Sequence, residues 1–143
     1  HSRVARSTTA ILERLGAEVV WIGPESLLPR FGFSSVRRTN SLDAELGGLD
    51  VVYLLRVQFE RLLPQEQFDR GRYVSAFQLD RSRLRRLKPS AIVMHPGPMN
   101  VGTEVDSFVA DSPAMLANAQ VTWGIYGRMA VIERAVRMSE VTW

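Results

Sequence analysis

Three short apolar runs, at residues 18–22, 50–55 and 91–94, constrain the fold of this chain more than any other feature. Each has the length of a buried β-strand and is followed by turn-forming or polar residues. Helical patterns separate the runs. Strands that alternate with helices predict a parallel sheet covered by helices on both faces, which is an α/β fold.

The pattern between these runs predicts where the helices lie. We expect helices at 4–15, 24–28, 42–46, 64–69, 81–88, 103–109 and 118–138, and a short strand at 36–38. Ser41 and Asp80 are suited to be N-caps, whereas the stretch 72–79 fits no element clearly. Because a helix precedes the first strand, we expect the chain to lack the first strand of its sheet and to be a fragment of a larger protein.

Composition limits the kind of chemistry that this chain can carry. Its 143 residues suit a single domain, 1–143, and include no Cys, so disulfides, thiolate metal sites and cysteine nucleophiles are excluded. His1 and His95 are the only histidines, and we expect neither a metal site nor a cofactor. No apolar run is long enough to span a membrane and no signal-peptide pattern opens the sequence, so we expect a cytoplasmic protein without a membrane partner.

The net charge of +3 comes mostly from arginine, because Lys88 is the only lysine among 18 basic residues. The densest basic run is 81–88, in which Leu84 and Leu87 would face inward at helical spacing and the charges outward. No series of aromatic residues accompanies it. We therefore interpret it as a solvated helix face, and expect no nucleic-acid binding.

Polar groups follow the predicted strands or begin the first helix. Arg3 and Arg6 lie at the helix start, Arg56 and Gln58 follow the second strand, and the loop 95–100 follows the third. The carboxyl ends of parallel strands share one sheet edge, so these segments could converge. Two guanidinium groups could each take one carboxylate of a small dianion.

The loop 95–100 could present bare backbone to such a ligand. Pro96 and Pro98 have no N–H group and Gly97 has no side chain, so carbonyl oxygens could face an amine. A purely structural role remains open for each of these groups. The arginines at 3 and 6 could belong to a solvated helix start, and residues 56–61 could form a surface ion-pair cluster. The loop 95–100 could be an ordinary rigid turn. His95 could be a general base or a hydrogen-bonded structural residue.

Three segments, at 1–7, 55–62 and 94–100, together resemble the carboxyl-terminal, aspartate-binding domain of the aspartate carbamoyltransferases. Residues 109–112, 120–122 and 128–130 fit the same family. The resemblance covers essentially the whole chain and implies a three-layer, Rossmann-like parallel sheet flanked by helices. It also implies a transferase of de novo pyrimidine biosynthesis, which carbamoylates the amine of L-aspartate with carbamoyl phosphate and releases phosphate.

The resemblance also implies residue roles. Arg3 and Arg56 would bind the two carboxylates of aspartate, and Gln58 would assist Arg56. Backbone carbonyls of Pro96 and Gly97 would accept hydrogen bonds from the carbamoyl and amino groups.

The same resemblance implies a cis peptide bond between Gly97 and Pro98. His95 would shape the strand end in a structural or supporting role, and no catalytic residue is assigned.

The family pattern further implies an amino-terminal carbamoyl-phosphate domain, which this sequence lacks, and a homotrimer with shared sites. The chain alone would then be inactive, and its last helix, which would pack on that domain, would expose an apolar face. The segments at 55–62 and 94–100 argue against the sister ornithine enzyme. Val101 and Trp123 stand where the family usually has Arg and Asn. They leave open a non-catalytic amino-acid-binding or regulatory paralogue, or a carbamoyltransferase for another amino acid.

Overall fold

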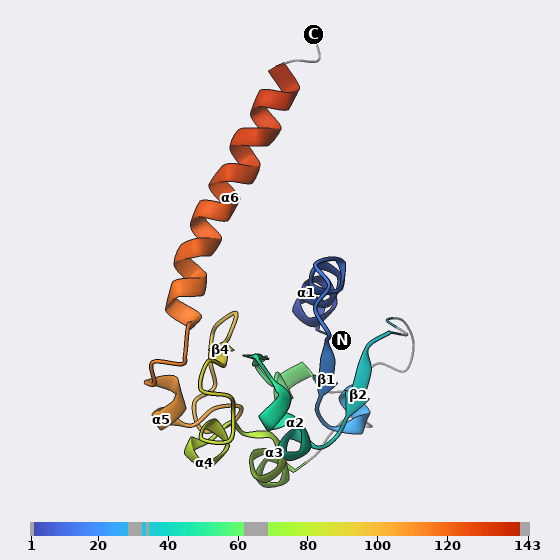
Figure 1. Ribbon diagram of the computed structural model, residues 1–143, viewed down its shortest axis with the longest axis vertical. Helices are drawn as coiled ribbons and strands as arrows, with labels where there is room; N and C mark the ends of the chain where they lie inside the picture. The colour runs from blue at the N-terminus through green and yellow to red at the C-terminus, as the bar shows by residue number, and fades with distance from the viewer. Residues whose placement is uncertain (1, 29–32, 34, 62–68, 141–143) are drawn as a thin grey trace.

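The computed structural model describes residues 2–28, 33, 35–61 and 69–140 (Figure 1). Its α-helices are α1 (Arg3–Arg14), α2 (Leu42–Glu45), α3 (Arg70–Phe77), α4 (Arg81–Leu84), α5 (Ser107–Ala110) and α6 (Ala117–Glu140). Its strands are β1 (Val20–Ile22), β2 (Arg37–Thr39), β3 (Val51–Tyr53) and β4 (Ile92–Met94). Three short 3-10 helices are η1 (Glu25–Leu27), η2 (Leu46–Gly48) and η3 (Phe59–Arg61).

All paired strands run parallel, which confirms the predicted α/β class. β1 pairs with β2 and β3 with β4, so the strands of the described chain form two two-stranded sheets instead of one continuous sheet. The segment 114–116 extends the second sheet, because Val93 donates to the carbonyl of Ala114 at 2.8 Å and accepts from Leu116 N–H at 2.8 Å. Residues 91–94 therefore lie between two neighbours, as expected for a buried strand.

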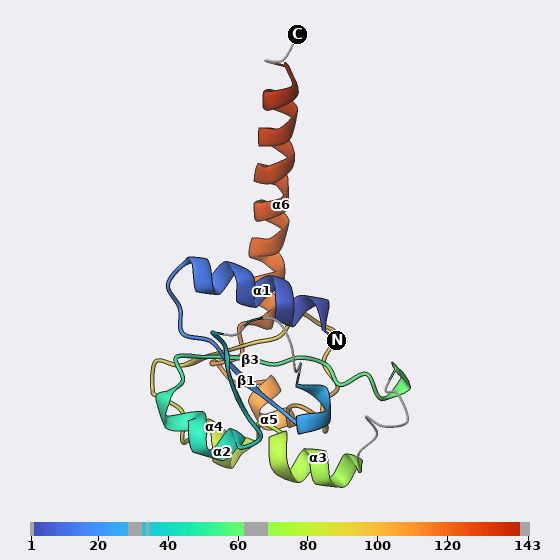
Figure 2. The ribbon, with the colours of Figure 1, turned by 90° about the vertical axis from the view of Figure 1, so that its right-hand side faces the viewer.

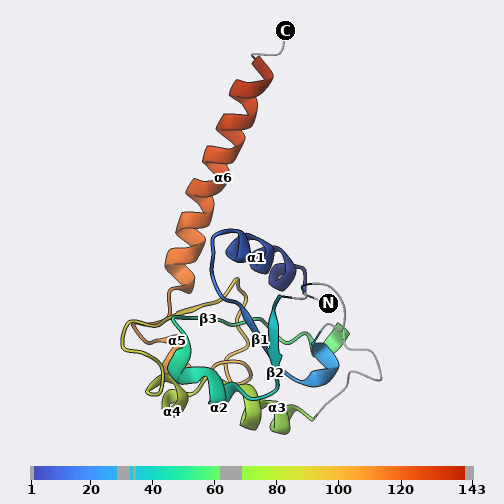
Figure 3. The same ribbon diagram turned by 45° about the vertical axis from the view of Figure 1, so that its right-hand side comes forward.

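Helices lie on two sides of the strands. Figures 2 and 3 show α1 on one side and α2, α3 and α4 on the other. Ser2 caps α1 through its side chain, and the Trp21 indole N–H donates to the Thr9 hydroxyl at 2.9 Å, which ties α1 to β1. The helix predicted at 4–15 is thus present and positioned by a buried hydrogen bond.

The core lies around β3 and β4. Ten buried apolar side chains form it, and Leu46, Leu79, Val93, Val105 and Val109 have almost no exposed surface. Leu79 joins this core through backbone bonds to both sides of Val105: it donates to the Glu104 carbonyl at 2.9 Å and accepts from Asp106 N–H at 3.2 Å. The end of α3 is thereby fixed to the segment that precedes α5.

One predicted helix differs from the structure, and another cannot be compared with it. The helix expected at 103–109 is wrong for its first half: 102–104 form a turn, Val105 bridges to Leu79, and α5 begins only at Ser107, capped by Asp106. Residues 72–79, which fitted no element clearly, mostly belong to α3. The helical piece predicted at 64–69 falls mainly on 62–68, outside the described residues.

The basic run contains one buried charge, contrary to the expectation of an entirely solvated face. Arg83 is only 8% exposed. Its guanidinium donates twice to the Asp43 carboxylate, at 2.7 and 3.2 Å, and to the carbonyls of Gln78 at 2.7 Å and Ser75 at 2.8 Å. These carbonyls lie at the end of α3, so Arg83 joins α2, α3 and α4.

The longest helix, α6, extends away from the rest of the protein in all three views (Figures 1–3). Side chains from 121 to 138 are exposed, and many are large and apolar: Val121, Trp123, Ile125, Tyr126, Met129, Val131, Ile132, Val136 and Met138. None of the described helices is both long enough and apolar enough to cross a membrane. An exposed apolar surface of this extent marks a contact surface.

We expect Arg83→Met to lower the free energy of unfolding by about 3 kcal/mol, because it keeps most of the buried stem but leaves two helix-end carbonyls without their donor and Asp43 without one of its two arginine partners. Urea denaturation measures this loss. The matched control is Arg86→Met, which also removes a partner of Asp43 but from a half-exposed side chain, and should cost about 0.5 kcal/mol. Equal losses in both variants would contradict the burial argument.

The same cluster predicts acid sensitivity. The hydrogen bond from Arg83, with the nearby charges of Arg83 and Arg86, holds the pKa of Asp43 below its usual value of 3.8. A depressed carboxylate pKa stabilises the fold above the unfolded value, and this contribution is lost as pH falls through the folded value. We expect the free energy of unfolding to fall below about pH 4, and less steeply in Asp43→Asn than in the parent. If the free energy of unfolding falls equally steeply with pH in Asp43→Asn and in the parent, Asp43 is not the source of the acid sensitivity.

Candidate functional site

Two predicted ligand-binding segments meet at one sheet edge. β3 and β4 are parallel and in register, with Tyr53 opposite Met94, and Leu54 N–H extends the pairing to the Met94 carbonyl at 2.8 Å. We call residues 56–58 the 56–58 segment and residues 95–100 the 95–100 loop. Each follows one of these strands directly, so both leave the sheet at its carboxyl edge, where open α/β sheets bind ligands.

His95 is completely buried and both of its ring nitrogens are engaged. Nδ1 accepts a hydrogen bond from Gly97 N–H at 2.8 Å, and Nε2 lies 3.2 Å from Oε1 of Glu104. A nitrogen that accepts carries no proton, so the ring proton sits on Nε2 and is donated to Glu104. The ring therefore has no free lone pair with which to remove a proton from a substrate.

The tip of the 95–100 loop is exposed backbone. Gly97 has a φ of +71° with nothing near the position of a Cβ, so glycine serves the left-handed conformation here and not close packing. The Gly97–Pro98 peptide bond is cis, as the resemblance implied. Gly97 and Pro98 are exposed and Pro96 is half-buried, so the backbone at the loop tip is accessible.

Glu104, which the sequence did not single out, lies beneath this loop. Its side chain is 2% exposed, and Oε1 accepts from Asn100 N–H at 2.6 Å as well as from His95. Oε2 is buried and has no hydrogen-bond partner among the described residues. Burial, together with the nearby charge of Glu104, raises the pKa of Tyr73 above its usual value.

Asn100 joins the two segments. Its side-chain amide donates to the carbonyl of Val57 at 3.2 Å. Val57 is the central residue of the 56–58 segment and is itself buried. The hydrogen bond thus brings Arg56 and Gln58 next to the 95–100 loop.

Arg56 forms an ion pair at 2.8 Å with Glu60, four residues further along the chain. This agrees with the alternative of a surface ion-pair cluster at 56–61. This pair is partly exposed, and such pairs contribute little to stability. The Nε of Arg56 is buried without a partner in the part of the chain that the structure describes. A ligand carboxylate can therefore replace Glu60 at small cost. Gln58 is half-buried and is not free of contacts.

Arg3 and Arg6 lie exposed in the first turns of α1. Within the described ranges, the Arg3 side chain makes no hydrogen bond or ion pair with the 56–58 segment or the 95–100 loop. The structure therefore joins two of the three predicted segments directly, and among the described residues it gives Arg3 no hydrogen bond or ion pair to either of them. His1 lies outside the described residues.

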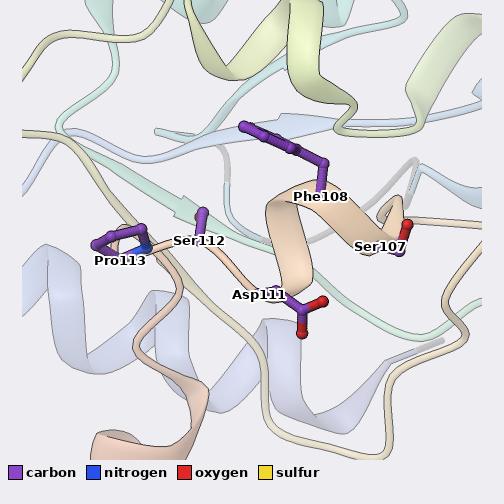
Figure 4. A pocket seen from close by; sticks show the side chains of 5 residues that line it. All are labelled: Ser107, Phe108, Asp111, Ser112 and Pro113. Atoms are coloured by element: carbon purple, nitrogen blue, oxygen red, sulfur yellow. The ribbon is translucent and has the colours of Figure 1, made fainter.

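A separate pocket lies beside α5 (Figure 4). It is lined by Ser107, Phe108, Asp111, Ser112 and Pro113. None of these is a predicted ligand-binding residue, and the only charged group is one aspartate. In residues 2–28, 33, 35–61 and 69–140, no three His, Asp or Glu side chains gather so as to hold a metal ion.

Comparison with known proteins agrees with this geometry. Residues 1–134 match the family model described as "Aspartate/ornithine carbamoyltransferase, Asp/Orn binding domain". The chain is 48% identical over 136 residues to the aspartate carbamoyltransferase catalytic subunit of Rhodococcus opacus, covering 94% of this chain and 43% of the relative. It is 46% identical over 140 residues to that of Legionella pneumophila strain Corby, covering 95% of this chain and 46% of the relative.

Solved structures show the same fold. Aspartate transcarbamoylase from Trypanosoma cruzi, in complex with carbamoyl aspartate and phosphate, gives a TM-score of 0.65 at 27% identity, over 80% of this chain and 39% of that one. Ornithine carbamoyltransferase from Thermus thermophilus gives a TM-score of 0.66 at 19% identity, over 81% of this chain and 38% of that one. At this lower identity the likeness concerns the fold alone.

The chain spans less than half the length of these curated relatives. The family model nevertheless covers nearly all of the chain. The chain therefore belongs to the aspartate/ornithine carbamoyltransferase family, and its residues 1–134 correspond to the Asp/Orn binding domain.

Proposed function

We propose that this chain is the aspartate-binding part of an aspartate carbamoyltransferase, which makes N-carbamoyl-aspartate and phosphate from L-aspartate and carbamoyl phosphate. The hydrogen bond from Asn100 to Val57 is the observation that carries the proposal. It places a cationic side chain beside exposed backbone carbonyls, which suits a ligand that bears both a carboxylate and an amine. The relatives at 46–48% identity are named for the same activity.

Arg56 would bind one aspartate carboxylate in place of Glu60, with Gln58 beside it. Arg3 would bind the second carboxylate once α1 lies against the bound substrate. A guanidinium binds a carboxylate through two parallel N–H donors, which fixes both position and orientation. The carbonyls of Pro96 and Gly97 would accept from the substrate amine and the carbamoyl group.

The reaction needs little from the protein beyond position and charge. The aspartate nitrogen forms a bond to the carbamoyl carbon, the bond from that carbon to the phosphate oxygen breaks, and the amine proton leaves with phosphate. His95 offers no free lone pair for this proton, since Nδ1 is occupied by Gly97 N–H. Catalysis would then come from holding the two reactants in contact and stabilising the developing negative charge.

Aspartate is a better match than ornithine for this site. The side chain of ornithine ends in an ammonium group, which the Arg56 guanidinium would repel, whereas the aspartate carboxylate is attracted to it. Arg56 also retains a buried Nε donor that no described group satisfies. The site therefore favours an anionic side chain.

The remaining part of the enzyme would bind carbamoyl phosphate. We propose an amino-terminal domain for this, because the chain spans only 43–46% of the two relatives described above. The exposed apolar side chains of α6 suit packing against such a domain. A homotrimer would complete the assembly.

Arg56→Ala in the complete protein that carries this chain should lower kcat/KM for aspartate roughly 100-fold, because charge-assisted hydrogen bonds to a carboxylate are lost. A steady-state assay with carbamoyl phosphate measures this. The KM for carbamoyl phosphate should change little. Arg85→Ala, which removes an exposed arginine outside the 56–58 segment and the 95–100 loop, is the control and should behave like the parent.

Three results of this assay would redirect the proposal. Full activity of Arg56→Ala would remove Arg56 from the substrate site. A folded parent protein without carbamoyl transfer would favour a non-catalytic amino-acid-binding or regulatory paralogue. Faster carbamoylation of a different amine would assign the chain to another amino acid.

Arg3→Ala should also reduce kcat/KM for aspartate roughly 100-fold in the complete protein, by loss of the second carboxylate partner. The comparison is Arg6→Ala, because Arg6 is also exposed and lies about one turn further along α1. This variant should have a smaller effect. An unchanged aspartate response in Arg3→Ala would show that α1 does not reach the substrate.

The 143-residue chain alone should show no steady carbamoyl transfer, because carbamoyl phosphate would be bound by the amino-terminal domain proposed above. Product formation can be followed by release of phosphate from carbamoyl phosphate that depends on aspartate. Sustained turnover by the chain alone would contradict the need for a second domain.

A further inference from the structure

We propose that Glu104 is a positioning residue, which holds the 95–100 loop through His95 and Asn100 and so aligns the Pro96 carbonyl with Arg56. This inference rests on the proposed function, since it assigns a role to a residue that does not touch the substrate. It is carried by two chains of hydrogen bonds that start from one carboxylate oxygen.

The first chain aims a carbonyl. Oε1 of Glu104 accepts from His95 Nε2 at 3.2 Å, and His95 Nδ1 accepts from Gly97 N–H at 2.8 Å. That N–H belongs to the same planar, trans peptide unit as the Pro96 carbonyl, and the two groups of a trans peptide point in opposite directions. Because the imidazole holds the N–H toward the interior, the Pro96 carbonyl is directed away from His95.

The second chain sets the distance between the two halves of the site. The same Oε1 accepts from Asn100 N–H at 2.6 Å, and the Asn100 side chain donates to the Val57 carbonyl at 3.2 Å. Val57 is bonded on either side to Arg56 and Gln58. Glu104 therefore fixes both ends of the 95–100 loop, one at Gly97 and the other at Asn100, and the second end is fixed to the 56–58 segment.

The backbone of Glu104 is itself held in place. Its carbonyl accepts from Leu79 N–H at 2.9 Å, and Leu79 accepts from Asp106 N–H at 3.2 Å. Both neighbours of Glu104, Thr103 and Val105, are buried to the same degree. A carboxylate at such a position costs free energy unless its partners repay it, and here only one of its two oxygens has partners. Those partners lie in the 95–100 loop, which points to loop position as its role.

The test compares Glu104→Gln with Glu104→Leu in the complete protein. Gln keeps an acceptor oxygen at Oε1, so activity should stay within about 5-fold of the parent, whereas Leu removes it and should lower kcat for aspartate carbamoylation roughly 100-fold by misplacing reacting groups. The KM for carbamoyl phosphate should not change. Equal losses in Gln and Leu, or parent-like activity in Leu, would overturn the proposal.

Thr103→Val is the matched control. Thr103 is as buried as Glu104 and accepts from Arg70 at 2.8 Å, but its side chain makes no bond to the 95–100 loop. It should therefore lose stability without losing kcat. A comparable loss of kcat in Thr103→Val would show that any disturbance of 103–105 has this effect, and would overturn a specific role for Glu104.

Asn100→Ala tests the second chain separately and serves if Glu104→Leu does not fold. It removes only the bond to Val57, so it should lower kcat/KM for aspartate. Its effect should combine with that of Glu104→Leu by less than the product of the two fold-changes, because both act on one unit. Multiplicative effects would contradict a shared pathway.

Hydrogen exchange of the peptide that contains residues 95–100 separates this proposal from the proposed function. Exchange should be faster in Glu104→Leu than in the parent and unchanged in Thr103→Val. If the parent protein has no carbamoyl transfer, the proposed function fails and the exchange result alone decides whether Glu104 holds the loop. Unchanged exchange in Glu104→Leu would overturn the inference whatever the activity.

Discussion

The parallel pairing of β3 with β4 is the constraint on which the rest of this structure depends. Parallel neighbours end at the same edge, so the segments that follow them begin side by side without any further interaction. The register that sets Tyr53 opposite Met94 ends both strands at the same level, just before the 56–58 segment and the 95–100 loop. A single side-chain bond, from Asn100 to Val57, is then enough to join them.

Strand and helix positions followed largely from the sequence, because apolar runs and caps are local signals. Ser2, Ser41, Asp80 and Asp106 all cap helices through their side chains. The error at 103–109 has a physical cause. Val105 is bridged to Leu79, which is more than twenty residues away, and no local pattern contains that partner.

The candidate site was only partly predictable for the same reason. Motif segments indicated Arg56, Gln58 and the loop tip, which lie where strand ends place them. Glu104 gave no such signal, because its partners are a ring nitrogen and a backbone N–H of the loop before it. The local sequence shows only a glutamate between Thr103 and Val105. The burial of these three residues becomes visible only in the structure.

Two buried charged residues, Arg83 and Glu104, differ in how completely their polar atoms find hydrogen-bond partners. This difference distinguishes a charge that serves folding from one that we propose serves function. Arg83 reaches one carboxylate and two helix-end carbonyls, so its burial is explained by joining three helices. Glu104 leaves one oxygen without a partner in the described chain, and both of its bonds run to a single exposed loop. An apolar side chain would fill that position at lower cost to folding. We therefore propose that the carboxylate serves the position of the loop, on which the proposed reaction would depend.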